Sequence, residues 1–367
     1  MTASANRGYM PEVDHLRAFA ALMVLFYHGL QLIGPHLVST VSLRPNNPLV
    51  LLVQEGHTGV GLFIVLSGFI LSLGAIGNKI HYKEFLVARI LRLYPMLIVC
   101  LLVAVQVTGS NLTSLLTSLL PVNAQGGVGG SFAALFWAVA VEFQCYLVFP
   151  FLIAFSNERG SRFIVQVIAV AFTLRLLAFL AVDGVNARDL SYWGTIGRID
   201  QFCIGMIAAR LYLSKNLDRL HRGWFFLSAI VAALVLWRFN RLGGWSSIGA
   251  WKIAWPTIEG AMWAFFIVTY VAAGRSLPSS IRWAGAKLGE ISYSMYLIHF
   301  SVVLAIVKNG FYLRPTGNGH YDLMLTTLLV ALPITIAIAI LTYYTIELPF
   351  LRLRPKYIAR TKQPITA

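Results

Sequence analysis

The sequence predicts an all-α, polytopic membrane protein with about ten transmembrane helices around a polar interior passage. Two observations carry this prediction. Hydrophobic residues make up 58% of the 367 residues and charged residues only 12%, whereas soluble domains average about 45–50% and about 25%. Ionisable side chains also lie inside apolar segments, where they are costly unless they face an internal site. We therefore expect a single integral membrane domain, residues 1–367.

Ten apolar segments match the length of a membrane-spanning helix. Crossing a hydrocarbon core of about 30 Å takes roughly 17–25 residues. Two of the ten, 93–107 and 224–237, are shorter than that. The predicted spans are 16–34, 58–76, 93–107, 132–155, 163–182, 196–213, 224–237, 253–271, 291–307 and 323–346.

The distribution of Lys and Arg predicts the orientation of these spans. If the connectors alternate between two sides and the N-terminus lies inside, 20 Lys and Arg fall on the inner side and seven on the outer side. An excess of Lys and Arg marks cytoplasmic connectors. We therefore expect the short N-terminal segment 1–15 and the basic tail 351–367 in the cytoplasm.

Charge and cysteine content argue against a nucleic-acid-binding protein and against a protein built on disulfides or a metal site. The net charge is +15, but Lys and Arg are dispersed over many connectors and form no basic stripe interleaved with aromatic residues, so we expect no nucleic-acid partner. Cys100, Cys145 and Cys203 lie in apolar runs without paired spacing. The sequence therefore predicts neither a disulfide framework nor a metal site.

The first span carries the most informative pair of residues, Arg17 and His28. They are eleven residues apart, which places them on nearly the same helix face and separates them by roughly 17 Å along the axis. An imidazole in the middle of a span is suited to act as a base or proton carrier. The structural alternative is that Arg17 reaches the lipid headgroups and His28 is hydrogen-bonded within the bundle.

Polar residues of the next spans suggest a binding site. Arg89 and Arg92 lie one turn apart just before the third span, and their guanidinium groups are suited to binding phosphate. Attraction of a basic flank to anionic lipid explains them equally well.

In the second span, small residues favour close helix packing, with Ser67 as a polar contact. Glu142 and Tyr146 share a face of the fourth span, where the carboxylate needs a partner. Arg17 or Arg198 could supply it, in a catalytic or a purely structural ion pair.

Further polar residues lie near the ends of the spans. Glu55 and His57 precede the second span and could meet an incoming substrate, although we prefer the interpretation that they are exposed loop residues. Arg198 and Asp200 form an opposite-sign pair close to the outer edge. Later in the chain, Ser292, Tyr296 and His299 are at helical spacing and form a polar seam on one face. Glu347 faces the cytoplasmic boundary among basic residues, ahead of Pro349, which is expected to end the last helix.

These residues, in this order, resemble the acyltransferase-3 family of integral membrane acyltransferases, which O-acylate polysaccharides, Nod factors and some macrolides. The resemblance covers nearly the whole chain. It departs at Phe63-Ile64, where family members often have two aromatic residues. It rests on Arg17-x10-His28, Ser67-Gly68-Phe69, Arg89-x-x-Arg92 with Pro95, Trp137…Glu142…Tyr146…Pro150, Gly197-Arg198, Tyr293…Tyr296-Leu-Ile-His299 and Glu347-Leu-Pro349.

The resemblance implies an acyl-CoA donor, with acetyl-CoA expected, and no bound cofactor. The acceptor would be a hydroxyl of a glycan, glycolipid or macrolide on the outer side of a bacterial inner membrane. His28 would act as general base or, alternatively, as a transient acyl carrier. The implied roles are catalytic for His28, Arg17 and Glu142, donor-binding for Arg89, Arg92, Tyr94 and Ser67, and pore-lining or acceptor-side for Tyr146, Arg198, Tyr296, His299 and Glu347.

Two other functions stay open from the sequence. A transporter or flippase for glycans or lipid-linked sugars would also have a polar interior, but it would need no thioester. A purely structural or sensory membrane protein would not require Arg17 and His28 on one helix face. The expected partners besides donor and acceptor are the lipid bilayer and, as an open alternative, a second copy of the chain in a homodimer.

Overall fold

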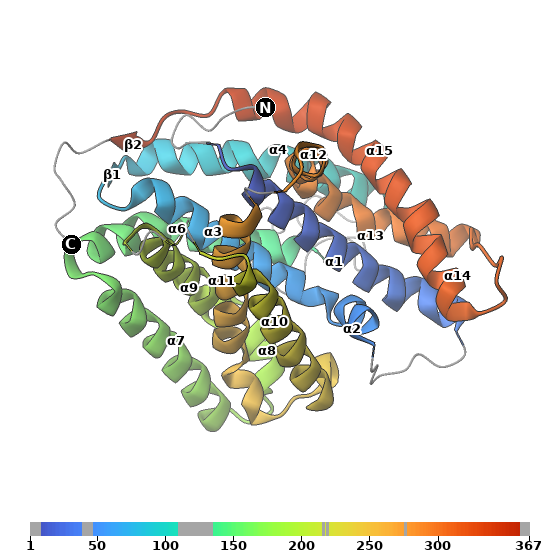
Figure 1. The fold of residues 1–367 in the computed structure, drawn as a ribbon, viewed down its shortest axis with the longest axis horizontal. Coiled ribbons are helices and arrows are strands. Elements are labelled where there is room, and N and C mark those ends of the chain that lie inside the picture. The colour runs from blue at the N-terminus through green and yellow to red at the C-terminus, as the bar shows by residue number, and fades with distance from the viewer. Residues whose placement is uncertain are drawn as a thin grey trace.

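The computed structural model describes residues 9–38, 47–108, 135–214, 217, 220–274 and 277–359. In these residues the chain forms a bundle of helices with one small two-stranded sheet (Figure 1). The elements are α1 (Pro11–Leu37), α2 (Pro48–Gln54), η1 (Gly56–Thr58), α3 (Gly59–Ala75), β1 (Lys79–Ile80), α4 (Tyr82–Thr108), α6 (Phe136–Arg159), α7 (Ser161–Ala181), α8 (Ala187–Tyr192), α9 (Thr195–Ser214), α10 (Gly223–Arg241), η4 (Gly244–Ser246), η5 (Ala250–Ile253), α11 (Trp255–Gly274), α12 (Ser279–Glu290), α13 (Ser292–Asn309), α14 (Gly319–Thr326), η6 (Thr327–Ala331), α15 (Leu332–Thr342), η7 (Tyr343–Glu347), α16 (Leu348–Arg352) and β2 (Ile358–Ala359).

The predicted fold class is confirmed. Within the described residues, eight helices are long and apolar enough to cross a membrane, and α12 with α13, bent by 66°, make a ninth when counted as one span. Each of the ten predicted spans falls on a helix, apart from residues 132–134, which lie outside the described part. The tenth is α9, whose three charged residues lower its hydropathy.

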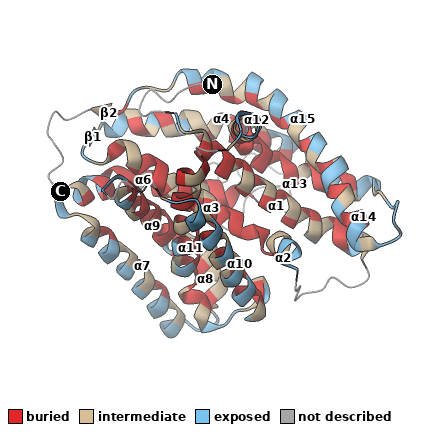
Figure 2. Ribbon diagram, in the orientation of Figure 1, coloured by how far each residue is buried: buried red, intermediate tan, exposed pale blue. Residues whose placement is uncertain are grey.

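Burial distinguishes central helices from peripheral ones. Figure 2 shows α1, α3 and α9 buried along most of their length, whereas α7 and α10 expose much of theirs. The exposed side chains of α7 are mainly apolar, among them Val165, Leu177 and Leu180. An apolar exposed surface is what contact with lipid requires. Of the charged residues of α9, Arg198 and Asp200 are instead buried among the surrounding helices.

Two glycines let α3 and α9 cross in backbone contact. A Cβ atom on Gly68 would lie 2.1 Å from the carbonyl oxygen of Phe202, and one on Gly205 would lie 2.1 Å from that of Val65. The hydrophobic effect does not drive helices together in lipid, so helix association there depends on close packing, which small residues allow. The packing interpretation of the small residues in the second span is confirmed.

Replacing Gly205 with alanine is expected to lower the temperature of thermal unfolding in detergent, because the new methyl group has no room against the α3 backbone. Overpacking of this kind costs about 1–3 kcal/mol. Gly194→Ala is the matched control, since a Cβ there has nothing within 4 Å. Equal unfolding temperatures for the two variants would contradict the close crossing.

Two element boundaries differ from the prediction. α4 begins at Tyr82, eleven residues before the predicted start at 93, because Arg89 and Arg92 lie within the helix and line an internal cavity, while hydropathy counts them as connector. Pro349 was expected to end the last helix, and this was wrong: helix continues through α16 to Arg352. Proline is tolerated in the first turn of a helix, and the π-helical turn η7 directly precedes α16.

One end of the bundle gathers the beginning of α1, the connector between α3 and α4, and the C-terminal segment. β1 pairs antiparallel with β2, with Lys79 opposite Ala359, and the strands lie side by side in Figure 1. α12 packs on the start of α1, where His15 Nε2 is hydrogen-bonded to the carbonyl oxygen of Arg282 at 2.9 Å. We call this the terminal end. The opposite end carries α2, α8, η4 and η5.

Candidate functional site

An internal cavity lies between α1, α3, α4, α6 and α13. It has about 720 Å³ of space free of protein atoms, including the part that opens to solvent. We call it the arginine cavity, because three of its polar lining residues are arginines. The polar and aromatic side chains that line it are Arg17, Phe63, Ser67, Arg89, Arg92, Glu142, Tyr146, Ser292, Tyr293 and Tyr296.

The arginines come from two helices that begin at the terminal end. The guanidinium of Arg89 lies 5.6 Å from the centre of the Tyr146 ring, and that of Arg92 lies 5.8 Å from the centre of the Tyr293 ring. Arg17 Nη1 pairs with Asp14 at 3.1 Å. Aromatic faces hold guanidinium groups without neutralising them. The cavity therefore offers an anion several positive charges.

Glu142 is bonded to hydroxyl groups instead of to an arginine. Ser67 Oγ donates to its Oε1 at 2.6 Å, and the Tyr146 hydroxyl donates to the same atom. In the described residues Arg17 is ion-paired with Asp14, and Arg198 with Glu259. The expected ion pair of Glu142 with one of these arginines was wrong, because neighbouring hydroxyls satisfy the carboxylate first.

His28 faces the interior of the bundle and is bonded to His299. His28 Nδ1 lies 3.0 Å from His299 Nε2, and His299 Nδ1 lies 3.1 Å from the carbonyl oxygen of Met295. A carbonyl oxygen only accepts, so His299 Nδ1 carries a proton. With both rings neutral, His299 Nε2 accepts and His28 Nδ1 donates. This leaves His28 Nε2 with a free lone pair, as a general base needs.

The histidine pair lies between two cavities and lines neither of them. Tyr296 lines the arginine cavity, and its ring centre is 5.9 Å from that of His299. On the other side, Tyr27 and Gln31, neighbours of His28 on α1, line a second cavity toward the opposite end. This second cavity has about 1010 Å³ of space free of protein atoms, including its open part. We call it the Glu55 cavity, and its lining also includes Leu30, Glu55, Asn240 and Trp245.

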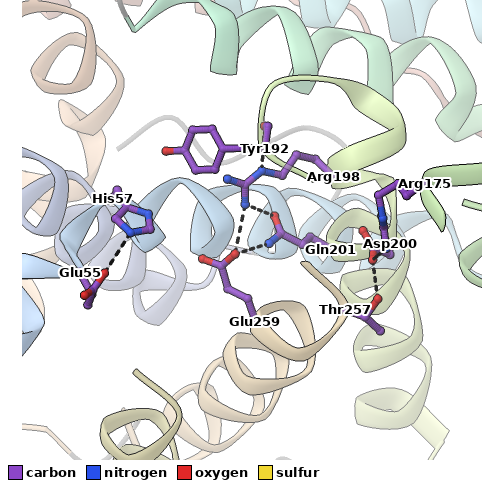
Figure 3. Close-up of polar contacts among 9 residues, drawn as sticks. All are labelled: Glu55, His57, Arg175, Tyr192, Arg198, Asp200, Gln201, Thr257 and Glu259. Carbon is purple, nitrogen blue, oxygen red and sulfur yellow. Dashed lines mark hydrogen bonds and ion pairs between the residues drawn. The ribbon is translucent and has the colours of Figure 1, made fainter. Parts of the chain in front are cut away.

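Glu55 and His57 are buried, so their interpretation as exposed loop residues was wrong. Their side chains are 2% and 4% exposed, because the short helix α2 and the turn η1 lie against α1. His57 Nε2 is 3.1 Å from Glu55 Oε2 (Figure 3), and Asn240 Nδ2 donates to Glu55 Oε1 at 2.7 Å. The His57 ring contacts the rings of Tyr27, Tyr192, Phe239 and Trp245.

Arg198 belongs to a second buried network beside this dyad (Figure 3). Arg198 Nη1 donates to Glu259 Oε2 and to Gln201 Oε1, each at 3.1 Å, and Gln201 Nε2 donates to Glu259 Oε2 at 2.7 Å. Asp200 instead pairs with Arg175 at 2.9 Å. The predicted Arg198–Asp200 pair was wrong, because residues two apart on a helix point to different sides.

Several buried side-chain atoms in this region have no hydrogen-bond partner among the described residues. They include His57 Nδ1 and Glu259 Oε1. Buried polar atoms are nearly always bonded, so an exception suggests a missing ligand or water. Nearby, burial lowers the pKa of Lys252 to about 8, an effect that the Glu55 and Glu259 carboxylates oppose.

The remaining predicted residues lie apart from the arginine cavity lining. Glu347 is 2% exposed and accepts a hydrogen bond from Ser294 Oγ. Tyr94 packs edge-on against Phe143, with ring centres 5.3 Å apart. It follows Arg92 by two residues and therefore points away from the cavity face of α4.

Sequence reasoning missed several residues of these networks. Glu259 was detectable, because a carboxylate inside the predicted span 253–271 is a functional candidate by default. Asn240 follows the predicted span 224–237 and Lys252 precedes the predicted span 253–271. Neither lies in a local sequence pattern that marks it as functional.

Comparison with known proteins finds relatives that align with most of the chain. Nodulation protein 10 of Rhizobium leguminosarum bv. viciae is 25% identical over 397 residues, which cover 97% of each chain. The O-acetyltransferase OatA of Staphylococcus aureus strain NCTC 8325 is 23% identical over 361 residues, covering 88% of this chain and 55% of that protein. No solved structure matches the chain significantly.

The family described as an acyltransferase domain matches residues 10–344. This match spans every helix that lines the two cavities. It favours an enzyme over a transporter or flippase. The chain therefore belongs to the acyltransferase-3 family and is an integral membrane O-acyltransferase.

Proposed function

We propose that the protein moves an acyl group, with acetyl expected, from cytosolic acyl-CoA to a hydroxyl of a glycan or glycolipid at the outer face of a bacterial inner membrane. His28 is the general base. The observation that carries this proposal is the position of the His28–His299 pair between the arginine cavity and the Glu55 cavity.

The terminal end faces the cytoplasm in this proposal. The connectors at that end are the ones rich in Lys and Arg, as the positive-inside rule requires. The pairing of β1 with β2 supports an arrangement in which the tail and the connector between α3 and α4 lie on the same side. The arginine cavity then opens toward cytosolic acyl-CoA.

Arg89 and Arg92 hold donor phosphates, with Arg17 near the donor's entry. Guanidinium groups bind phosphate through paired hydrogen bonds. The thin pantetheine arm passes Ser67 and Glu142 toward Tyr296, where the thioester meets the histidine pair. Tyr296 lines the cavity and packs against His299, with ring centres 5.9 Å apart. Its side chain moves aside when the thioester arrives, while His299 stays bonded to His28.

The chemical step is direct transfer. His28 Nε2 takes the proton of the acceptor hydroxyl while its oxygen attacks the thioester carbonyl carbon. The tetrahedral intermediate collapses with cleavage of the C–S bond, and the protonated His28 returns the proton to the departing thiolate. The products are the acyl ester and free CoA thiol.

The Glu55 cavity is the acceptor side. Its lining combines the indole of Trp245 with the carboxylate of Glu55 and the amide of Asn240, groups that can stack on a sugar ring and bond its hydroxyls. The unpartnered atoms His57 Nδ1 and Glu259 Oε1 add further hydrogen-bonding capacity nearby.

The proposal is tested by mixing purified protein with acetyl-CoA and a bacterial surface glycan and measuring release of free thiol. Thiol release that depends on the glycan, together with ester formation on it, is the expected result. Transport of the glycan without any thiol release would overturn the proposal in favour of a transporter.

Replacing both Arg89 and Arg92 with alanine is expected to weaken acetyl-CoA binding by about tenfold or more, since each charge-assisted hydrogen bond contributes about 1.5–3 kcal/mol. The loss should be largest at low ionic strength and shrink as salt is added, because salt screens the attraction between the arginines and the phosphates. The control variant replaces Lys79 in β1 and Lys83 in the first turn of α4. Both lysines are exposed and do not line the cavity. If calorimetry shows unchanged donor affinity, the arginine pair does not bind the donor, and attraction to anionic lipid headgroups remains as its explanation.

A further inference from the structure

The C-terminal segment returns to the start of α4 and contacts Arg89, which lines the arginine cavity. We call residues 353–359 the C-terminal strap. Its β2 strand pairs with β1, and the backbone amide of His81 donates to the carbonyl oxygen of Tyr357 at 2.9 Å. α4, which carries Arg89 and Arg92, begins directly after this pairing. The strap is thus attached to the same segment that supplies the donor-binding arginines.

Tyr357 connects the strap to Arg89. Its side chain is 6% exposed and packs edge-on against Phe85, with ring centres 5.1 Å apart. Arg89 Nη2 donates to the Tyr357 hydroxyl at 3.4 Å, and the Arg89 guanidinium lies 5.4 Å from the ring centre. The strap therefore helps to set the position of Arg89.

Arg354 brings a fourth guanidinium to this region. Its Nε donates to the carbonyl oxygen of Leu351 at 3.0 Å, which holds the side chain against the end of α16. Burial and the charges of Arg92 and Arg89, with a smaller effect of Arg17, lower the pKa of Arg354 to about 10. The four positive charges are thus close enough to repel one another.

Carboxylates offset only part of this repulsion. In the part of the chain that the structure describes, Arg17 pairs with Asp14, and Glu347 and Glu142 attract Arg92, but no ion pair joins a carboxylate to Arg89, Arg92 or Arg354. Clustered guanidinium groups with few acidic partners are stabilised by a polyanion, and phosphate matches their geometry. Coenzyme A carries a diphosphate and a separate 3′-phosphate at the end opposite its thiol.

We propose that the C-terminal strap forms one wall of the donor site and that Arg354 joins Arg89 and Arg92 in binding the phosphates of the nucleotide end. This inference rests on the proposed acyl-CoA donor. The strap then has a binding role besides its place in the fold, and donor binding reduces its motion.

The test uses the full-length purified protein and calorimetry with CoA and with pantetheine, which lacks the phosphates and the nucleotide. Arg354→Gln is expected to weaken CoA binding by about tenfold to a hundredfold and to leave pantetheine binding unchanged. Arg354→Lys should keep part of the affinity. Arg352→Gln is the matched control, because Arg352 is an exposed arginine two residues earlier.

Hydrogen exchange provides a second measurement that does not depend on the variants. CoA is expected to slow amide exchange in residues 353–359 of the wild-type protein. Unchanged CoA affinity in Arg354→Gln, an equal loss of pantetheine affinity, or unaltered exchange in the strap would each overturn the inference. Failure of the wild-type protein to bind CoA would instead overturn the proposed function, so the two failures are distinguishable.

Discussion

Replacing His28 with alanine is expected to reduce acyl transfer by about 10²–10⁴-fold, the contribution that general-base catalysis makes. The variant loses the nitrogen that accepts the proton of the acceptor hydroxyl. It keeps the arginine cavity, which His28 does not line, so CoA affinity should stay at the wild-type value. Thiol release from acetyl-CoA and calorimetry measure the two quantities separately.

A control on the same helix isolates the catalytic effect. His36 is an exposed histidine near the end of α1, stacked on Tyr312 with ring centres 5.5 Å apart. His36→Ala should keep full turnover. Wild-type turnover in His28→Ala, with normal insertion into the membrane, would rule out His28 as the base. A loss of CoA affinity equal to the loss of turnover would indicate a structural role.

Replacing Glu259 with alanine is expected to destabilise the fold by about 3–5 kcal/mol, because it leaves the Arg198 charge buried without its partner. The Glu259 and Arg198 side chains are 1% and 2% exposed, so the guanidinium is shielded from water where it lies. The double replacement Arg198→Leu with Glu259→Leu should destabilise less than either single change. Thermal unfolding in detergent measures all three variants.

The exposed Arg188–Asp189 pair supplies the control for this prediction. Its atoms are 2.9 Å apart, but the side chains are 28% and 35% exposed. Exposed ion pairs contribute about 0–1 kcal/mol, so Arg188→Ala should change the unfolding temperature far less than Glu259→Ala. Equal shifts for the two variants would show that burial does not govern the Arg198–Glu259 interaction.

Much of the fold could be predicted because hydropathy and helical periodicity are local properties. The spans follow from apolar runs of sufficient length, and the common face of Arg89 and Arg92 follows from 3.6 residues per turn. The same rule puts Ser292 and Tyr296 on one face of α13, where both line the arginine cavity. The boundary errors at α4 and α16 arose where charged or proline residues lie inside a helix.

Sequence by itself determined the membrane-spanning all-α architecture, the family and the residue types available for chemistry. Only the tertiary structure decided which partner each buried polar group takes: Glu142 with Ser67, Arg198 with Glu259, and His28 with His299. The reason is that helix packing, with backbone contacts as close as those at Gly68 and Gly205, sets the distances between groups far apart in the chain. Local sequence carries no measure of those distances.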